Sequence, residues 1–178
     1  MITYVALLRG VNVGGKTLKM DWLRQSCDDM GLRDVRTYVQ SGNIVFRSQM
    51  SAPKLAQTLK TTIDAQTRLA VTVVIRTAAE ISKIVADSPF LKRKGIDVAK
   101  LHVTFLNKAP AKPPLDKLDA LAGDRDEYHL SARELYLHCP LNYGETKLSN
   151  TAIEKVLVVG ATTRNWKTIM KLHEMVTQ

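Results

Sequence analysis

The sequence has few cysteines, four histidines without metal-site spacing, and no long apolar run. Cys27 and Cys139 lie far apart on segments that read as a helix and a strand, so we expect buried thiols rather than a disulfide. The histidines form no HxxxH pattern and have no CxxC partner, so no metal or other cofactor is expected. No apolar stretch approaches the roughly 18 residues of a membrane span, and there is no signal or lipidation motif. The sequence therefore predicts a cytoplasmic, bacterial-type protein that does not bind membranes.

Aromatic residues are scarce, at 6% of the chain, whereas basic residues are in excess. The 45% of apolar residues is enough to form a core in a chain of 178 residues. The net charge of +9 favours acidic partners such as nucleic acid or phosphorylated metabolites, but it is spread along the chain and is a weak guide. The one short basic run, Lys92-Arg93-Lys94, reads as a solvated loop, with nucleic-acid contact as the alternative.

The first 77 residues have the pattern of an α-β plait. The expected elements are a strand over 2–8, a helix over 20–30, strands over 34–40 and 43–48 separated by Ser41-Gly42, a helix over 51–68 and a strand over 70–77. This βαββαβ order is typical of the ferredoxin-like fold, with an antiparallel sheet ordered 4-1-3-2. We therefore predict an α+β protein whose first domain is a ferredoxin-like plait over residues 1–77.

The remaining residues predict a second plait-like unit and a helical end. The expected elements are a helix over 78–87, a strand over 100–106, a short helix over 115–121, and strands over 127–130 and 134–139. Residues 78–140 would form the second plait-like unit. Residues 141–178 are predicted to be a helical carboxyl-terminal segment packed on the others, with one helix starting at a capping box from Thr151 to Glu154 and another capped by Thr162-Thr163.

Residues 9–17, RGVNVGGKT, match the GxxxxGK[ST] pattern of a nucleotide-binding loop. In such a loop the helix begins at the GK pair and the preceding strand lies in a parallel sheet. Here the first helix signal is at Met20-Asp21, and the tight hairpin that follows requires antiparallel pairing. No apolar strand ends in an aspartate suited to hold magnesium. The sequence therefore predicts that the chain does not hydrolyse ATP or GTP.

A different anion site is predicted at one edge of the first sheet. In a plait, the end of the first strand, the start of the first helix and the hairpin between strands two and three share that edge. Glycines let backbone N–H groups approach an anion, while cations supply charge and amides and hydroxyls supply orientation. The candidate ligand-binding residues there are Arg9, Asn12, Gly14, Gly15, Lys16, Gln40, Ser41 and Asn43. The alternative is that the hairpin residues only form the turn, the glycines only allow positive φ, and the arginine is paired internally.

The segment TTRNW at 162–166 has two interpretations. In the functional one, Arg164 and Asn165 bind a phosphate or a base edge at a helix start, and Trp166 stacks on a ring. In the structural one, Thr163 caps the helix, Trp166 packs in the core and Arg164 pairs with a carboxylate. We favour the structural role for Trp166 and keep Arg164 and Asn165 as candidate ligand-binding residues.

Three segments resemble the motifs of one bacterial family, the domain of unknown function numbered 1697. RGVNVGGKTLKM, TYVQSGNIVF and TTRNWKTIMKL follow in the family's order and together span essentially the whole chain. The resemblance implies two α-β plait units followed by a helical carboxyl-terminal segment, and it implies no established activity. By motif match the signature positions are Arg9, Asn12, Gly14, Gly15, Gln40, Ser41, Gly42, Asn43, Arg164, Asn165 and Trp166.

Three functions stay open at this point. The leading hypothesis is binding of a small phosphate-bearing ligand or nucleotide at residues 9–17 and 40–43. A nucleic-acid-binding module is the second, although the third strand lacks the aromatic pattern of an RNA-recognition motif. The third is an enzyme acting on a phosphorylated substrate. Its predicted edge contains no acid or base, and neither Tyr143 nor Glu145 is favoured to supply one.

Overall fold

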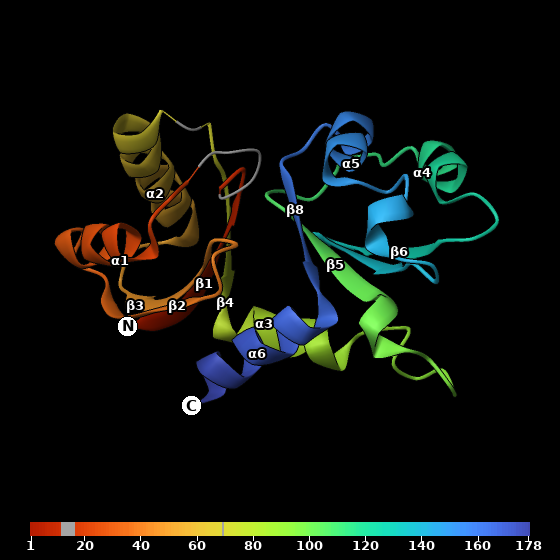
Figure 1. Cartoon of the computed structure of the whole chain (residues 1–178), viewed down its shortest axis with the longest axis horizontal. Coiled ribbons are helices and arrows are strands. Elements are labelled where there is room, and N and C mark those ends of the chain that lie inside the picture. Colours follow the sequence, from red (N-terminus) through yellow and green to blue (C-terminus); the bar gives the residue numbers. More distant parts are fainter. Residues whose placement is uncertain (12–16, 69) are drawn as a thin grey trace. The chain divides into compact units, whose positions relative to one another are not determined.

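A computed structural model describes residues 1–11, 17–68 and 70–178 (Figure 1). Within these ranges the protein is a mixed α+β chain with six α-helices and two four-stranded antiparallel sheets. Residue contacts divide it into two compact units, Met1–Ser82 with Leu172–Gln178, and Lys83–Lys171. The divisions therefore fall inside two helices, α3 (Ala78–Ala86) and α6 (Trp166–Thr177). Of the helices described, none combines the length and the apolar character needed to cross a membrane.

The first unit has the element order that its sequence predicts. Its elements are β1 (Ile2–Arg9), α1 (Met20–Asp29), β2 (Arg33–Tyr38), β3 (Asn43–Ser48), α2 (Ala52–Thr67) and β4 (Thr72–Thr77). The strands lie in the order β2-β3-β1-β4, and each neighbouring pair is antiparallel, which confirms the predicted order 4-1-3-2. Because β1 and β2 both pair antiparallel with β3, they run parallel to each other. The end of β1 and the β2–β3 turn therefore share one edge of the sheet.

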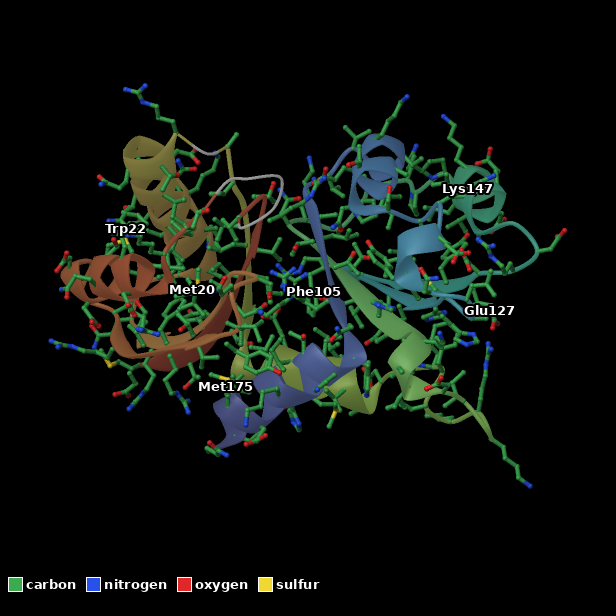
Figure 2. The ribbon with its side chains drawn as sticks, viewed as in Figure 1. Met20, Trp22, Phe105, Glu127, Lys147 and Met175 are labelled. Carbon is green, nitrogen blue, oxygen red and sulfur yellow. The ribbon has the colours of Figure 1, made fainter. Side chains whose placement is uncertain are left out.

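The core of the first unit lies between one face of this sheet and the two helices α1 and α2, which cover that face (Figure 1). Alternate β1 residues Tyr4, Ala6 and Leu8 point into it, as the two-residue period of a strand requires. Cys27 of α1 is fully buried there, and burial raises the pKa of its thiol to about 12. Met20, the first residue of α1, packs at the margin of this core (Figure 2).

The last turn of α6 belongs to the first unit. Arg36 of β2 donates a hydrogen bond from Nη2 to the Met175 carbonyl at 2.5 Å. Carbonyls in the last turn of a helix have no partner within the helix, and the negative end of the helix dipole favours a cation. Arg36 therefore caps the carboxyl-terminal end of α6 and attaches it to the first sheet.

The second unit repeats the element order of the first. Its elements are β5 (Leu101–Leu106), α4 (Leu115–Ala122), β6 (Glu127–Ser131), β7 (Glu134–His138), α5 (Asn150–Leu157) and β8 (Ala161–Asn165). The strand order β6-β7-β5-β8 corresponds strand by strand to β2-β3-β1-β4. Its core packs α4 and α5 against the sheet and includes Cys139, whose thiol pKa is raised to about 11 by burial. Both cysteines are thus buried and free, as predicted.

Two buried arginines occupy equivalent positions in the two units. Arg76 of β4 lies opposite Val5 of β1, and Arg164 of β8 lies opposite Val103 of β5. Arg76 is fully buried and Arg164 is 9% exposed. Each donates from Nη1 to the carbonyl of the residue before it, at 2.9 Å in both cases. The correspondence between the units therefore extends to individual side chains.

The carboxyl-terminal segment is not wholly helical, so that prediction was wrong in part. Residues Ala161–Asn165 form β8, which pairs antiparallel with β5, and α6 begins only at Trp166. The predicted helix cap, Thr163, instead makes hydrogen bonds with Thr104 at 2.7 Å and with Asn150 at 2.8 Å. Threonines suit a strand as well as a cap, and the available partner β5 decides between them. The division into domains 1–77, 78–140 and 141–178 stays a prediction.

The start of α5 also differs from the prediction. Ser149 is the N-cap, and its hydroxyl accepts a hydrogen bond from the Ala152 amide at 3.3 Å. Glu154, the expected partner of Thr151 in a capping box, accepts instead from the Ala161 amide at 2.9 Å. Glu154 thus supports the start of β8. The capping-box spacing from Thr151 to Glu154 thus lies inside α5 and does not mark its start.

Candidate functional site

The β2–β3 turn, residues 39–42, packs directly on the end of β1. The Leu8 amide donates to the Gly42 carbonyl at 2.8 Å. A Cβ atom added to Gly42 would lie 2.7 Å from Leu8 Cβ and 2.7 Å from Val11 Cγ2. Gly42 also has φ +75°, a conformation that L side chains rarely adopt. Only glycine therefore fits at this contact.

Asn43 closes this turn from inside the fold. Its side chain is fully buried, and Nδ2 donates to the Tyr38 carbonyl at 3.0 Å and to Ser41 Oγ at 2.9 Å. These bonds fix the distance between the two strands and the position of the Ser41 hydroxyl. The turn-forming role considered from the sequence is therefore present, and a ligand contact by Asn43 stays a prediction.

The exposed part of the turn carries the other predicted hairpin residues. Gln40 and Ser41 are exposed, and Arg9, the last residue of β1, is half-buried beside Thr72 of β4. Val39 is 51% exposed and has φ 50°, which is unusual for a β-branched residue and is strained. The surrounding hydrogen bonds hold this conformation, so the backbone of the turn has a fixed shape.

Four candidate residues, Asn12, Gly14, Gly15 and Lys16, lie outside the described residues. The flanking structure still bears on the nucleotide-binding pattern. Both sheet neighbours of β1 are antiparallel to it, and α1 begins at Met20 rather than at the GK pair. A nucleotide-binding loop of the GxxxxGK[ST] type follows a strand in a parallel sheet and opens a helix. The described part of the chain has neither arrangement.

Arg164 and Asn165 belong to the second unit, whereas Arg9 and the hairpin belong to the first. Arg164 donates to Thr162 Oγ1 at 2.7 Å, and burial lowers its pKa to about 10, although Tyr143 opposes the shift. It therefore stays cationic at neutral pH.

Asn165 Oδ1 accepts from the Thr168 amide at 2.8 Å and so caps α6, and Trp166 is 5% exposed. Asn165 and Trp166 thus have structural roles, and ligand contacts by Arg164 and Asn165 stay predictions.

A cluster of charged groups in the second unit was not predicted from the sequence. Arg93 Nη1 donates to both carboxylate oxygens of Glu127, at 2.8 and 2.7 Å, and His138 Nδ1 lies 2.9 Å from Glu127 Oε1. Glu127 is labelled in Figure 2. The hydrogen bond with His138, and then that with Arg93, holds the pKa of Glu127 below its usual range. The Arg93 guanidinium also lies 4.8 Å from the centre of the Phe90 ring. The short basic run is therefore attached to the second sheet through Arg93.

Comparison with known proteins now identifies the family. Residues 1–136 match the family model described as "Protein of unknown function (DUF1697)". The chain belongs to the DUF1697 family. Among solved structures it is similar to the conserved bacterial protein SP0830 from Streptococcus pneumoniae, with a TM-score of 0.75 and 22% identity over 100% of this chain and 99% of that one. At this identity the similarity concerns the fold alone. No protein with a curated description matches the chain.

The close contact at Gly42 predicts a specific loss of stability in this DUF1697 protein. We expect Gly42→Ala to lower the free energy of unfolding by about 2 to 5 kcal/mol, because it adds both backbone strain and a clash with Leu8 and Val11. Gly31→Ala is the matched control, since Gly31 also has φ +77° but has no atom within 4 Å of an added Cβ. It should cost only about 1 kcal/mol. Urea unfolding of both variants measures the difference, and equal losses would contradict the close contact.

The cap at Asn165 gives a second prediction. Asn165→Ala should lower the free energy of unfolding by about 1 kcal/mol, because the Thr168 amide loses its side-chain acceptor. Asn165→Asp should retain most of the stability, since a carboxylate also accepts this bond and favours a helix amino terminus. Thermal melting of the two variants tests the role. An alanine variant as stable as the unchanged protein would show that Asn165 is not a cap.

Proposed function

We propose that this DUF1697 protein binds a small phosphate-bearing anion at the edge where the β2–β3 turn meets the end of β1. The supporting observation is the 2.8 Å hydrogen bond between the Leu8 amide and the Gly42 carbonyl. It keeps the turn that carries exposed Gln40 and Ser41 against the end of β1, whose last residue is Arg9. Polar groups from two distant parts of the sequence thereby converge on one edge of the sheet.

Each group has a distinct chemical task in this proposal. Arg9 supplies the positive charge and up to two parallel hydrogen bonds to phosphate oxygens. Ser41 and Gln40 orient the anion, and Asn43 holds the Ser41 hydroxyl in place through its 2.9 Å bond. Gly14, Gly15 and Lys16 enter from the sequence pattern, as backbone donors and a second cation. Asn12 is assigned to the same ligand on that basis.

We also infer that both units are ferredoxin-like plaits. The inference is supported by the βαββαβ order in each unit and by the shared strand order of the two sheets. In this fold the end of the first strand and the middle hairpin lie at the same edge of the sheet. The proposed anion site uses that edge in the first unit.

Replacing Arg9 tests the site directly. Arg9→Ala should weaken binding of pyrophosphate and ADP by roughly ten- to a hundredfold, equivalent to about 1.5 to 3 kcal/mol for a charged hydrogen bond. Arg33→Ala is the matched control, because Arg33 is exposed at the opposite end of β2 from the turn. Titration calorimetry measures affinity, and melting curves verify that both variants fold.

Three results would count against the anion site. These are no binding of either phosphate compound, equal losses in Arg9→Ala and Arg33→Ala, or unfolding of Arg9→Ala, which would make Arg9 a structural residue. A short oligonucleotide included in the same series distinguishes the second candidate function. If it binds more tightly than ADP and loses affinity steeply as salt rises, the ligand is nucleic acid.

The absence of nucleotide hydrolysis is a separate prediction. We expect no magnesium-dependent turnover of ATP or GTP, because both neighbours of β1 are antiparallel and α1 starts well after Lys16. A sensitive phosphate-release assay with the unchanged protein and with Lys16→Ala measures it. Turnover that the substitution abolishes would show that residues 9–17 act as a hydrolytic nucleotide site.

A further inference from the structure

Strand β6 forms one edge of the second sheet. It pairs only with β7, through Glu127 to Ser131, and no other described strand lies on its outer side. Half of the backbone N–H and C=O groups of an edge strand point away from the sheet, where they can pair with an additional strand. Many peptide-binding proteins use such an edge beside a helix.

An open groove of about 580 Å³ runs along this edge between α4 and β6. Leu115, Asp119 and Ala122 line it from α4, and Tyr128 and Leu130 line it from β6. Leu115 is 49% exposed, which is high for a leucine in a folded chain. The groove therefore places apolar and polar side chains next to the outer edge of β6.

Of the three carboxylates that line the groove, Asp119 is the one available to a ligand. Glu127 is paired with Arg93, and Asp126, whose side chain is 3% exposed, is paired with Arg125, whereas Asp119 is exposed on α4 and the lining includes no lysine or arginine. Tyr128 donates to Asp119 Oδ1 at 2.6 Å, and burial followed by this carboxylate raises the tyrosine pKa to about 12. Tyr128 thus stays a neutral donor that holds Asp119 in position.

We propose that this groove binds an extended peptide rich in lysine or arginine and in apolar residues, which adds a strand to β6. Alternate side chains of an added strand point to the same face as Tyr128 and Leu130, toward α4. Apolar peptide side chains would contact Leu115 and Leu130, and basic ones would lie near Asp119. A second copy of the chain is the alternative occupant, which sedimentation distinguishes below.

A suitable probe is a capped heptapeptide with threonine at every second position and with valine and lysine in turn at the positions between, so that valine and lysine share one face of the strand. We expect its binding to shift the backbone amide resonances of residues 127–131 in ¹⁵N spectra of the full chain. The same peptide N-methylated at every second residue, in each of the two registers, is the control for strand addition. In one of the two registers the methyl groups replace the peptide N–H groups that would donate to β6. That version should bind about tenfold more weakly or worse, because several hydrogen bonds are lost together. A peptide with glutamate in place of lysine should not bind.

The charge contribution is tested separately. Asp119→Asn should weaken binding of the valine-lysine peptide by roughly two- to fivefold. Asp28→Asn makes an equal charge change on an exposed residue of the first unit and should leave the affinity unchanged. Asparagine still accepts the bond from Tyr128, so the fold is expected to persist.

Four outcomes would overturn the proposal. They are no binding, equal binding of the unmodified peptide and both N-methylated versions, equal effects of the two substitutions, or resonance shifts outside β6 and α4. Sedimentation that shows a dimer through β6 would also overturn it, in favour of a second copy as the occupant. None of these measurements uses a phosphate ligand, so their result is independent of the anion site.

Discussion

The hydrogen bond from the Leu8 amide to the Gly42 carbonyl constrains every other feature of the candidate site. It joins the end of β1 to a turn that lies more than thirty residues later in the sequence. The register Leu7 opposite Asn43 depends on the same contact, and a shift of one residue would move all β3 side chains to the opposite face. The amide of Asn43 would then point into the apolar core under α1 and α2, and the core residues Ile44 and Phe46 would leave it.

The sequence was most informative where local pattern and tertiary pairing agree. Strand β3 has the predicted bounds, 43–48, because its apolar residues and the turn before it both indicate a strand. The sequence was least informative at Thr162 and Thr163, which suit a helix cap and a strand equally. Their state depends on pairing with β5, more than fifty residues away, and no local pattern records that. For the candidate site, the motif predicted the hairpin turn, whereas the internal role of Asn43 is shown by its hydrogen bonds to Tyr38 and Ser41.

Arg76 and Arg164 indicate which features the two units share beyond their strand order. Burying a guanidinium is costly unless its N–H groups are hydrogen-bonded, so a buried arginine at an equivalent position in both units is a specific shared feature. Here each arginine stands one residue before a helix cap, at Thr77 for α3 and at Asn165 for α6. The bond from each guanidinium to its preceding carbonyl stiffens the strand at the point where the chain changes direction. The common element is thus a rigid strand-to-helix junction.

The bond between Arg36 and Met175 means that the ends of the sequence and the ends of the folding units do not coincide. A fragment that stops at Ser82 contains all four strands of the first sheet but lacks the helical turn that Arg36 caps. A fragment in which a flexible linker joins residues 172–178 to residues 1–82 would contain that turn. The first compact unit is therefore discontinuous in sequence, and a truncation after Ser82 removes residues that this unit contacts.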